Sequence, residues 1–449
     1  MRRAVRSLPV LAALLVQVSV GRAVELGERK VPADALSVRL ERHQLPNGLV
    51  VLLAPDPSAS SAAVWMSFGA GALYAPPGLS GMPHLVEHLL AVGPTPETDY
   101  AGILERRRAR YFNARTSFDR MSFEVVVPAE ELPAALWVTA DRLTTLPALI
   151  DDAAVARNRK VVLEERAMTD VDVPYGLFHH HVLRKVFETP HPLHDGVIGT
   201  PEDLSRVTAA DVRRFVAERL VGANGILTVV GRFEPGATLA TIAELLGDLP
   251  AGAAARPPRL PPIELGLIDK KQEPLGRCPR VAMAWRFPTP APEDDAALAL
   301  GAQLLTFLTD GAWDMRLSSE LMRYDGEDVF SLELMVPYDE PMSAVHADAD
   351  GLLRQLTRKE MPIELVWNAN LVLDRVALDQ LDSIAGRAGL LTELEHRYGG
   401  RYPIADLLGW HWLLEPGAIR DTARTLLSGP SVVVHARPTR PRPARAERQ

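Results

Sequence analysis

The sequence is poor in cysteine. Cys278 is the only cysteine among 449 residues, so the chain cannot form an internal disulfide. No cluster of cysteines is available to bind a metal ion. Any metal centre must therefore be built from histidine and carboxylate side chains.

The sequence also lacks a long hydrophobic run. Its N-terminal apolar stretch, from Leu8 to Val20, is too short for a comfortable membrane span and contains a proline. Three arginines precede this stretch, and Gly-Arg-Ala follows it, which is typical of a signal peptide cleaved after Ala23. An uncleaved anchor is the alternative, and the absence of a nearby cysteine argues against a lipid anchor. We expect an exported protein of the periplasm or cell envelope.

Positive charge is in short supply. The formal net charge is −8, and loss of the four arginines in residues 1–23 takes it to −12. Such an acidic protein is a poor candidate for binding nucleic acid or an anionic membrane. The hydrophobic content of 47% is that of a globular protein, and the length exceeds one ordinary domain.

A short segment, Gly-Met-Pro-His-Leu-Val-Glu-His-Leu-Leu, carries the strongest chemical signal. It places His84, Glu87 and His88 in the order H-x-x-E-H. On a helix, residues four apart share a face, so the two imidazoles can hold one metal ion. Glu87 would then act as the general base, as in the inverted zincin arrangement. Two core histidines beside a chance glutamate are the alternative.

Two histidines leave a zinc ion one protein ligand short, because catalytic zinc usually takes three. The expected helix Arg157–Met168 carries Glu164 and Glu165. Helix neighbours differ by about 100° in direction, so only one of them can face the metal, and both could be ordinary surface charges. Three consecutive histidines at 179–181 point in three directions, and we expect a packed or solvated face there.

The chain is expected to contain two halves. Residues 250–263 are rich in alanine, proline and arginine, and the order of elements restarts after them, which suggests an internal duplication. We divide the chain into a signal peptide (1–23), a leader (24–36), a first half with the metal motif (37–249), a linker (250–264), a second half without the motif (265–436) and a disordered tail (437–449).

Periodicity and turn residues place the main elements. A Leu-Pro-Asn-Gly-Leu segment over 45–49 predicts a tight turn between extended runs. Strands are predicted over 50–53, 62–68, 111–116, 121–127, 225–230, 280–287 and 431–435. Helices are predicted over 98–110, 130–146, 151–168, 174–187, 209–220, 294–308 and 419–427.

Four motifs in this order resemble the M16 (pitrilysin-like) metallopeptidases, a family that includes mitochondrial processing peptidases and insulin-degrading enzymes. The resemblance covers roughly residues 38–436, and the length is similar to that of the short-chain members. The motifs are Leu45-Pro-Asn-Gly-Leu49, Gly81-Met-Pro-His-Leu-Val-Glu-His88, Asn113-Ala-Arg-Thr116 and Asn158-Arg-Lys-Val-Val-Leu-Glu-Glu165.

The resemblance implies an α+β fold. Two homologous α/β halves, each an antiparallel sheet with packed helices, would face each other across a chamber. The substrate peptide would add as a strand to a sheet edge at Asn113 and Ala114, and main-chain pairing would accept varied sequences. A turn residue closing the strand pair is the alternative for Asn113.

The resemblance also assigns roles at the site. Glu165 falls on the third zinc ligand, and Glu164 on the preceding, non-ligand position. Asn158 stands where the family usually has a second-shell glutamate, so ligand basicity is expected to differ. In the second half, Arg323 matches an arginine that helps to bind substrate, whereas Phe330 replaces the tyrosine seven residues later.

The sequence therefore favours an exported Zn²⁺-dependent endopeptidase or oligopeptidase that hydrolyses unstructured peptides, with Glu87 as the general base. The alternative is a weakly active or non-catalytic pairing subunit of an M16 heterodimer. A metal-binding module without hydrolysis would leave Glu87 idle. A homodimer or heterodimer with another M16-type chain is expected, because pairing would close the chamber. The absence of the phenol at Phe330 favours dependence on a partner.

Overall fold

The computed structural model describes residues 39–92, 99–257, 268–276, 278–309, 316–335, 341–402, 404–427, 429 and 431–439. The predicted signal peptide and leader lie outside this range, as do parts of the predicted linker and tail. Within the described residues, no helix combines the length and apolar character needed to cross a membrane.

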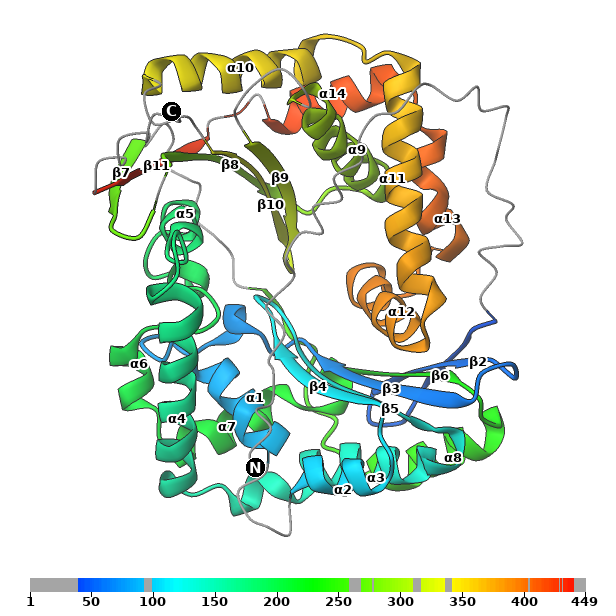
Figure 1. Ribbon diagram of the computed structural model, residues 1–449. Helices are drawn as coiled ribbons and strands as arrows, with labels where there is room; N and C mark the ends of the chain where they lie inside the picture. Colours follow the sequence, from blue (N-terminus) through cyan, green and yellow to red (C-terminus); the bar gives the residue numbers. More distant parts are fainter. Residues whose placement is uncertain are drawn as a thin grey trace, which may run out of the picture.

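A six-stranded sheet organises the first half (Figure 1). Its order is β1-β2-β6-β3-β5-β4, and every pair is antiparallel except β2 with β6. The central strands are continuous apolar runs because both faces of the sheet are covered. The strands are β1 (Glu41–Gln44), β2 (Val50–Pro55), β3 (Ser61–Phe68), β4 (Tyr111–Thr116), β5 (Met121–Pro128) and β6 (Gly225–Gly231).

Eight helices of the described chain belong to this half. Figure 1 shows most of them below the sheet, with α4, α5 and α6 along one side of the molecule. Thr208 caps α7 in a reciprocal capping box with Asp211. The helices are α1 (Met82–Val92), α2 (Tyr100–Arg106), α3 (Leu132–Thr144), α4 (Asp152–Arg166), α5 (Phe178–Val186), α6 (Pro201–Arg206), α7 (Ala209–Arg219) and α8 (Pro235–Leu246).

The second sheet repeats the arrangement of the first. Its order β7-β11-β8-β10-β9 places one parallel pair, β7 with β11, where β2 and β6 lie in the first sheet. This shared topology confirms two related halves, but each sheet is mixed and not purely antiparallel as expected. The strands are β7 (Ile268–Glu273), β8 (Arg280–Pro288), β9 (Arg316–Arg323), β10 (Glu327–Met335) and β11 (Val432–Pro438).

The expected start of the tail at Arg437 is wrong by two residues, because Arg437 and Pro438 belong to β11 and pair with β7. Every strand and helix predicted from the sequence has a counterpart. Strands β7, β9 and β10, helices α6 and α8, and the helices between residues 336 and 415 were not predicted. The helices of this half are α9 (Pro292–Thr309), α10 (Met342–Arg358), α11 (Ile363–Asp382), α12 (Ile384–Tyr398), α13 (Ile404–Gly409) and α14 (Pro416–Leu427).

Helix α12 crosses from the second half to the face of the first sheet opposite α1 and α4 (Figure 1). Ala388 and Leu391 are buried in a core cluster with residues of β2, β3, β5 and β6. A buried hydrogen bond of 2.6 Å joins the Thr228 and Thr392 hydroxyls. Gly389 permits this close approach, since a Cβ there would lie 2.9 Å from the Trp65 ring.

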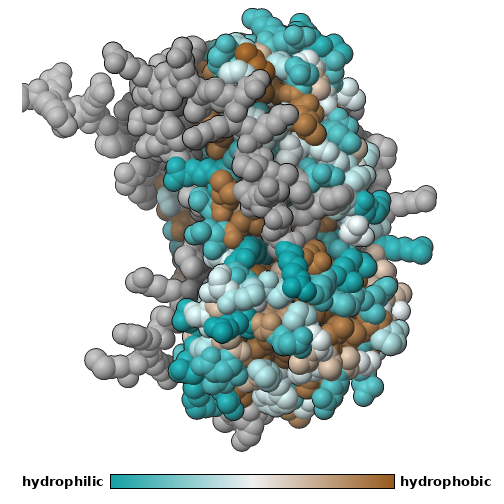
Figure 2. Space-filling model, turned by 90° about the vertical axis from the view of Figure 1, so that its right-hand side faces the viewer, coloured by the Kyte–Doolittle hydropathy of each residue, from teal (hydrophilic) through white to brown (hydrophobic). Residues whose placement is uncertain are grey.

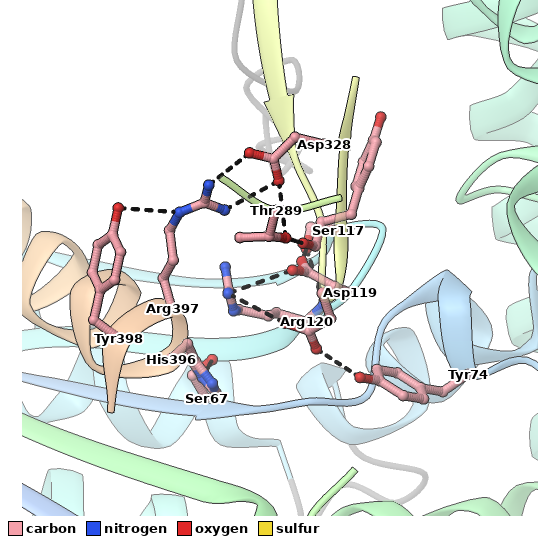
Figure 3. A network of polar contacts seen from close by, with 12 residues as sticks. Ser67, Tyr74, Ser117, Asp119, Arg120, Thr289, Asp328, His396, Arg397 and Tyr398 are labelled. Carbon is pink, nitrogen blue, oxygen red and sulfur yellow. Dashed lines mark hydrogen bonds and ion pairs between the residues drawn. The ribbon is translucent and has the colours of Figure 1, made fainter. Parts of the chain in front are cut away.

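Polar contacts also join the halves (Figure 3). The Tyr74 hydroxyl of the first half donates to Asp325 Oδ2 at 2.6 Å. His396 on α12 pairs with the Ser67 hydroxyl of β3 at 2.9 Å. Within the second half, Arg397 of α12 donates to Asp328 of β10 at 2.6 Å and so ties this helix to the second sheet. The two halves are therefore held together by apolar packing and by a buried polar network.

Candidate metal centre

Helix α1 brings the two motif histidines together. The Nε2 atoms of His84 and His88 lie 3.2 Å apart, and their ring centroids 4.7 Å apart. The apolar residues between and after them, among them Leu85 and Leu89, are at most 1% exposed. The helix thus buries its apolar face in the core and turns its histidines toward α4, against which it packs.

Helix α4 directs Glu165 at the histidines. Glu165 Oε2 lies 3.3 Å from His88 Nε2 and 3.8 Å from His84 Nε2. The Glu164 side chain is 62% exposed and lies 3.8 Å from the Lys160 ammonium, one turn back on the same helix. The pair of adjacent carboxylates is therefore resolved by the packing of α4 on α1: Glu165 converges on the histidines and Glu164 faces solvent.

These three donor atoms fit a zinc ion. Donors at 2.0–2.2 Å from a tetrahedral ion lie roughly 3.3–3.5 Å from one another. The three observed separations, between 3.2 and 3.8 Å, are close to that value. The side-chain donor atoms of His84, Glu87 and His88 also lie within 4.8 Å of one another, so Glu87 lies beside the proposed ligands.

Glu87 is buried beside this set and is held by a neighbouring strand. Its Oε2 atom lies 3.7 Å from His84 Nε2 and accepts a 3.2 Å hydrogen bond from the Thr116 hydroxyl. Burial raises the pKa of Glu87 to about 7. A carboxylate with such a pKa can take up and release a proton near neutral pH, as a general base requires.

Among the three proposed ligands, the pKa shifts of His84 and Glu165 suit metal binding, whereas the shift of His88 favours its protonated form. Burial lowers the pKa of His84 to about 4, so its imidazole is neutral at pH 7. The hydrogen bond from His88 lowers the pKa of Glu165. Burial lowers the pKa of His88, but Glu165 and Glu87 outweigh it, so that pKa is raised overall.

Strand β4 lies at the edge of the first sheet and pairs only with β5 among the described strands. Asn113 is exposed in the middle of β4, opposite Glu124, and Ala114 follows it. Asn113 is therefore not a turn residue, because the turn to β5 lies after Thr116. Since Thr116 bonds to Glu87, the free edge of β4 runs past the candidate metal centre.

Asn158 does not reach the centre. Its side-chain amide donates to the Ala154 carbonyl, one turn back on α4, at 3.0 Å. The buried Nδ1 atom of His84 has no hydrogen-bond partner among the described residues. The structure therefore gives no support to Asn158 as the group that orients a histidine ligand.

Arg323 and Phe330 are also occupied elsewhere. Asp295 accepts hydrogen bonds from Arg323 Nε at 2.8 Å and from its terminal nitrogen at 3.0 Å. Phe330 is fully buried in the core of the second half, 6.1 Å from the Trp285 ring. Neither residue contacts the histidines within the described chain.

Two neighbours of the centre were missed from the sequence. Thr116 ends the Asn-Ala-Arg-Thr motif, but its bond to Glu87 could not be inferred from spacing. Asp170 lies on the turn of π-helix that follows α4 and pairs with His180 at 2.9 Å. His179, the first of the three consecutive histidines, packs with its ring centroid 6.0 Å from that of Phe118.

Comparison with known proteins agrees with this geometry. A sequence model described as Insulinase (Peptidase family M16) matches residues 50–192. A second, described as Peptidase M16 inactive domain, matches residues 206–323, and the two together span more than half of the chain. The chain belongs to the M16 peptidase family.

Curated relatives within the M16 family match over part of their length. An uncharacterized zinc protease of Mycobacterium tuberculosis is 30% identical over 223 residues, which is 49% of this chain and 50% of the relative. A probable mitochondrial-processing peptidase subunit beta of Schizosaccharomyces pombe is 27% identical over 43% of this chain and 42% of its own. The chain thus spans about half the length of the curated relatives it matches.

Solved structures share the fold. A protease from Helicobacter pylori has a TM-score of 0.79 and 20% identity, covering 90% of this chain and 100% of its own. The periplasmic protease PqqL from Escherichia coli has a TM-score of 0.70 and 18% identity, covering 89% of this M16 chain and 47% of its own. These similarities confirm the two-half α+β architecture.

Proposed function

We propose that this chain is a zinc-dependent endopeptidase or oligopeptidase that hydrolyses peptide bonds in unstructured peptides. The observation that carries the proposal is the convergence of Glu165 on His84 and His88, with the buried Glu87 beside them. Three ligands leave one position of a tetrahedral site open, which is typical of catalytic and not of structural zinc. The naming of M16 relatives as zinc proteases supports the same assignment.

The chemistry would be divided among a few residues. His84, His88 and Glu165 would hold zinc, which when bound supplies Lewis-acid polarisation of water and of the scissile carbonyl. Glu87 would accept the proton of the attacking water and later pass it to the leaving amine. Thr116 would keep the Glu87 carboxylate in place through its hydroxyl.

The free edge of β4 would hold the substrate. An extended peptide can add to this edge by main-chain hydrogen bonds at Asn113 and Ala114. The edge ends at Thr116, which contacts the proposed base Glu87. A peptide bound along this edge would therefore lie next to the candidate metal centre. This mode requires an extended chain, which is why we propose unstructured peptides as substrates.

We also propose that the chain is exported to the periplasm or cell envelope by residues 1–23 and works as a homodimer or heterodimer of M16-type chains. Its domains would be residues 37–249 and 265–436, joined by a linker over 250–264, in accord with the two sheets.

The alternative, a weakly active or non-catalytic pairing subunit, is favoured by one observation. Asp295 engages Arg323 and the core buries Phe330, so the second half supplies neither group to the centre.

A peptide-cleavage assay of the full chain tests the proposal. The chain is assayed on unstructured peptides before and after chelation, and products are identified by mass spectrometry. We expect zinc at one equivalent per chain, cleavage that stops on chelation, and recovery on addition of zinc. Bound zinc with cleavage only after addition of another M16 chain would favour a weakly active pairing subunit. No bound zinc would contradict the zinc peptidase and favour the non-catalytic pairing subunit.

A further inference from the structure

The segment that leads into β4 and forms it is basic, although the chain as a whole is acidic. Residues 105–116 contain five arginines and one glutamate, whereas the formal net charge of the chain is −8. Arg107 pairs with Glu131 just before the strand begins. Arg115 lies within β4 itself, one residue before Thr116. Positive charge is therefore concentrated beside the edge that we propose holds the substrate.

Charge, and not apolar surface, distinguishes this edge. Figure 2 views the molecule from the side where α11 and α13 lie in Figure 1, and hydrophobic areas interrupt the hydrophilic surface there. Exposed apolar residues thus occur away from the candidate metal centre and do not indicate which substrate would bind at it. The exposed residues of β4 are Asn113 and Arg115, and both are polar.

A buried carboxylate fixes the position of the Arg115 guanidinium. Arg115 Nε lies 3.2 Å from Oε1 of Glu124 on β5, whose side chain is 1% exposed. Glu124 also accepts hydrogen bonds from the Tyr111 hydroxyl at 2.7 Å and from the Ser122 hydroxyl at 3.3 Å. Because Arg115 is already held, it would lose little conformational freedom on binding a ligand.

Arg115 keeps donors for a second carboxylate. Its closest contact with Glu124 uses Nε, and its side chain is 49% exposed. Glu124 is its one ion-pair partner in the described part of the chain. The terminal nitrogens of an arginine can bind a carboxylate through two parallel hydrogen bonds. Arg115 can therefore hold Glu124 and a substrate carboxylate at the same time.

Arg115 lies close to the candidate centre but on the opposite face of β4. Alternate side chains of a strand point to opposite faces, so Arg115 shares a face with Asn113, whereas Thr116 turns to Glu87. Burial lowers the pKa of Arg115, but the charges of Glu124 and Glu87 help to raise it overall. Arg115 and the proposed base are therefore within electrostatic reach of each other.

We propose that Arg115 binds a carboxylate side chain of the substrate, and that acidic peptides are the preferred substrates of the centre. This inference rests on the proposed function and names a substrate class for the same site. A peptide added to the β4 edge would present every second side chain to the Arg115 face. The preference for aspartate or glutamate should therefore apply at one position near the cleaved bond and not at its two neighbours.

The alternative is that Arg115 only neutralises Glu124. In that case Arg115→Gln and Glu124→Gln should have similar effects, because each breaks the same ion pair. Substrate binding by Arg115 predicts different effects. Arg115→Gln removes the group that binds the substrate carboxylate, whereas Glu124→Gln removes only a carboxylate that competes for it.

Cleavage of paired peptides tests the inference. Mass spectrometry of a digested peptide mixture locates the acidic position, and two peptides are then made that differ only in glutamate or glutamine there. The wild-type chain should cleave the glutamate peptide with a kcat/KM about tenfold higher. That ratio should fall to about one in Arg115→Gln and stay above about five in Glu124→Gln. Arg107→Gln is the matched control and should keep the ratio, since Arg107 is 55% exposed and also pairs with a glutamate.

A variant without the buried charge covers the case in which Arg115→Gln does not fold. Arg115→Gln combined with Glu124→Gln leaves no buried carboxylate unpaired. It should also cleave the two peptides at about equal rates.

Peptide binding separates this inference from the proposed function, because it needs no turnover. Fluorescence anisotropy is measured with both labelled peptides on the full chain after chelation. The glutamate peptide should bind about tenfold more tightly to the wild type and lose that advantage in Arg115→Gln. Acid-selective binding without cleavage would contradict the proposed function and keep the inference. Equal binding of the two peptides by the wild type, or an equal loss of selectivity in Arg115→Gln and Glu124→Gln, would overturn it.

Discussion

Glu87 and Glu165 both lie within 4 Å of the His84 imidazole, yet their pKa values shift in opposite directions. Glu87 is buried, so its neutral form is favoured and its pKa is raised to about 7. Glu165 is partly exposed and paired with His88, so its charged form is favoured. Their surroundings therefore suit one carboxylate to proton transfer and the other to metal binding.

Glu87→Gln should lower peptide turnover by about 10²-fold or more while zinc binding is retained. The amide keeps the size of the side chain but cannot accept the proton. Turnover and zinc content are measured on the same preparation. Unchanged turnover would exclude Glu87 as the base.

Glu165→Ala should abolish stoichiometric zinc binding, since it removes one of three converging donors. Glu164→Ala is its matched control and should retain zinc, because that side chain faces solvent. Metal content by atomic spectroscopy distinguishes the two. Zinc lost in the Glu164 variant and kept in the Glu165 variant would reverse our assignment.

Asn158→Ala should change zinc affinity by no more than about twofold. Loss of a group that orients a ligand typically costs 10–100-fold in affinity, but the Asn158 amide bonds to its own helix. Competition with a chromophoric chelator measures the affinity. A tenfold loss would show that Asn158 acts on the centre after all.

Among the elements, α12 does the most to unite the halves. It belongs to the second half by sequence, but its apolar residues complete a core of the first sheet. Polar pairs fix its position, among them Arg42 with Glu395 at 2.8 Å and Arg387 with Asp56 at 2.7 Å. Because α12 of the second half packs on the sheet of the first half, we expect the two halves to unfold together.

The contact of α12 with β3 should make stability depend on pH. Burial, with the charge of Arg120, holds the pKa of His396 well below 6.5. The folded state keeps this imidazole neutral while the unfolded chain takes up a proton below about pH 6.5, so stability should fall as pH drops below that value. Urea midpoints at pH 8 and pH 5.5 should differ less in His396→Gln than in the wild type. Equal differences would show that His396 does not contribute.

At the scale of the whole molecule, the two halves share a sheet topology but differ in the side chains that they contribute to the candidate metal centre. The first half carries the candidate ligands, the base and the free strand edge. In the second half, Arg323 forms an ion pair with Asp295, and Phe330 is buried in the core. The second half thus supports the first through α12 and the polar network between them.

Phe330→Tyr should destabilise the protein by about 1–3 kcal/mol and should not raise peptide turnover. Its ring is fully buried beside Trp285, so a new hydroxyl would meet packed apolar atoms and not a substrate. Denaturant unfolding and the peptide assay measure the two effects. A gain in turnover would mean that the ring leaves the core in the active state.

The sequence by itself determined the local parts of this protein. A four-residue spacing placed His84 and His88 on one helical face, and hydrophobic periodicity and turn residues located strands and helices. The motif order also indicated the M16 family, and the repeated order of elements after residues 250–263 indicated the duplication. These features depend on neighbours along the chain, where backbone geometry fixes distances.

Residue spacing left Glu164 and Glu165 open, and the family resemblance favoured Glu165. The tertiary structure supplies the physical reason, because the packing of α4 on α1 directs Glu165 at the histidines. The tertiary structure alone placed Thr116 against Glu87, turned Phe330 into the core and tied Arg323 to Asp295. It also brought α12 across to the first sheet, so that its apolar face meets a partner more than 150 residues away. Such contacts join distant segments, and their geometry follows from packing and not from spacing.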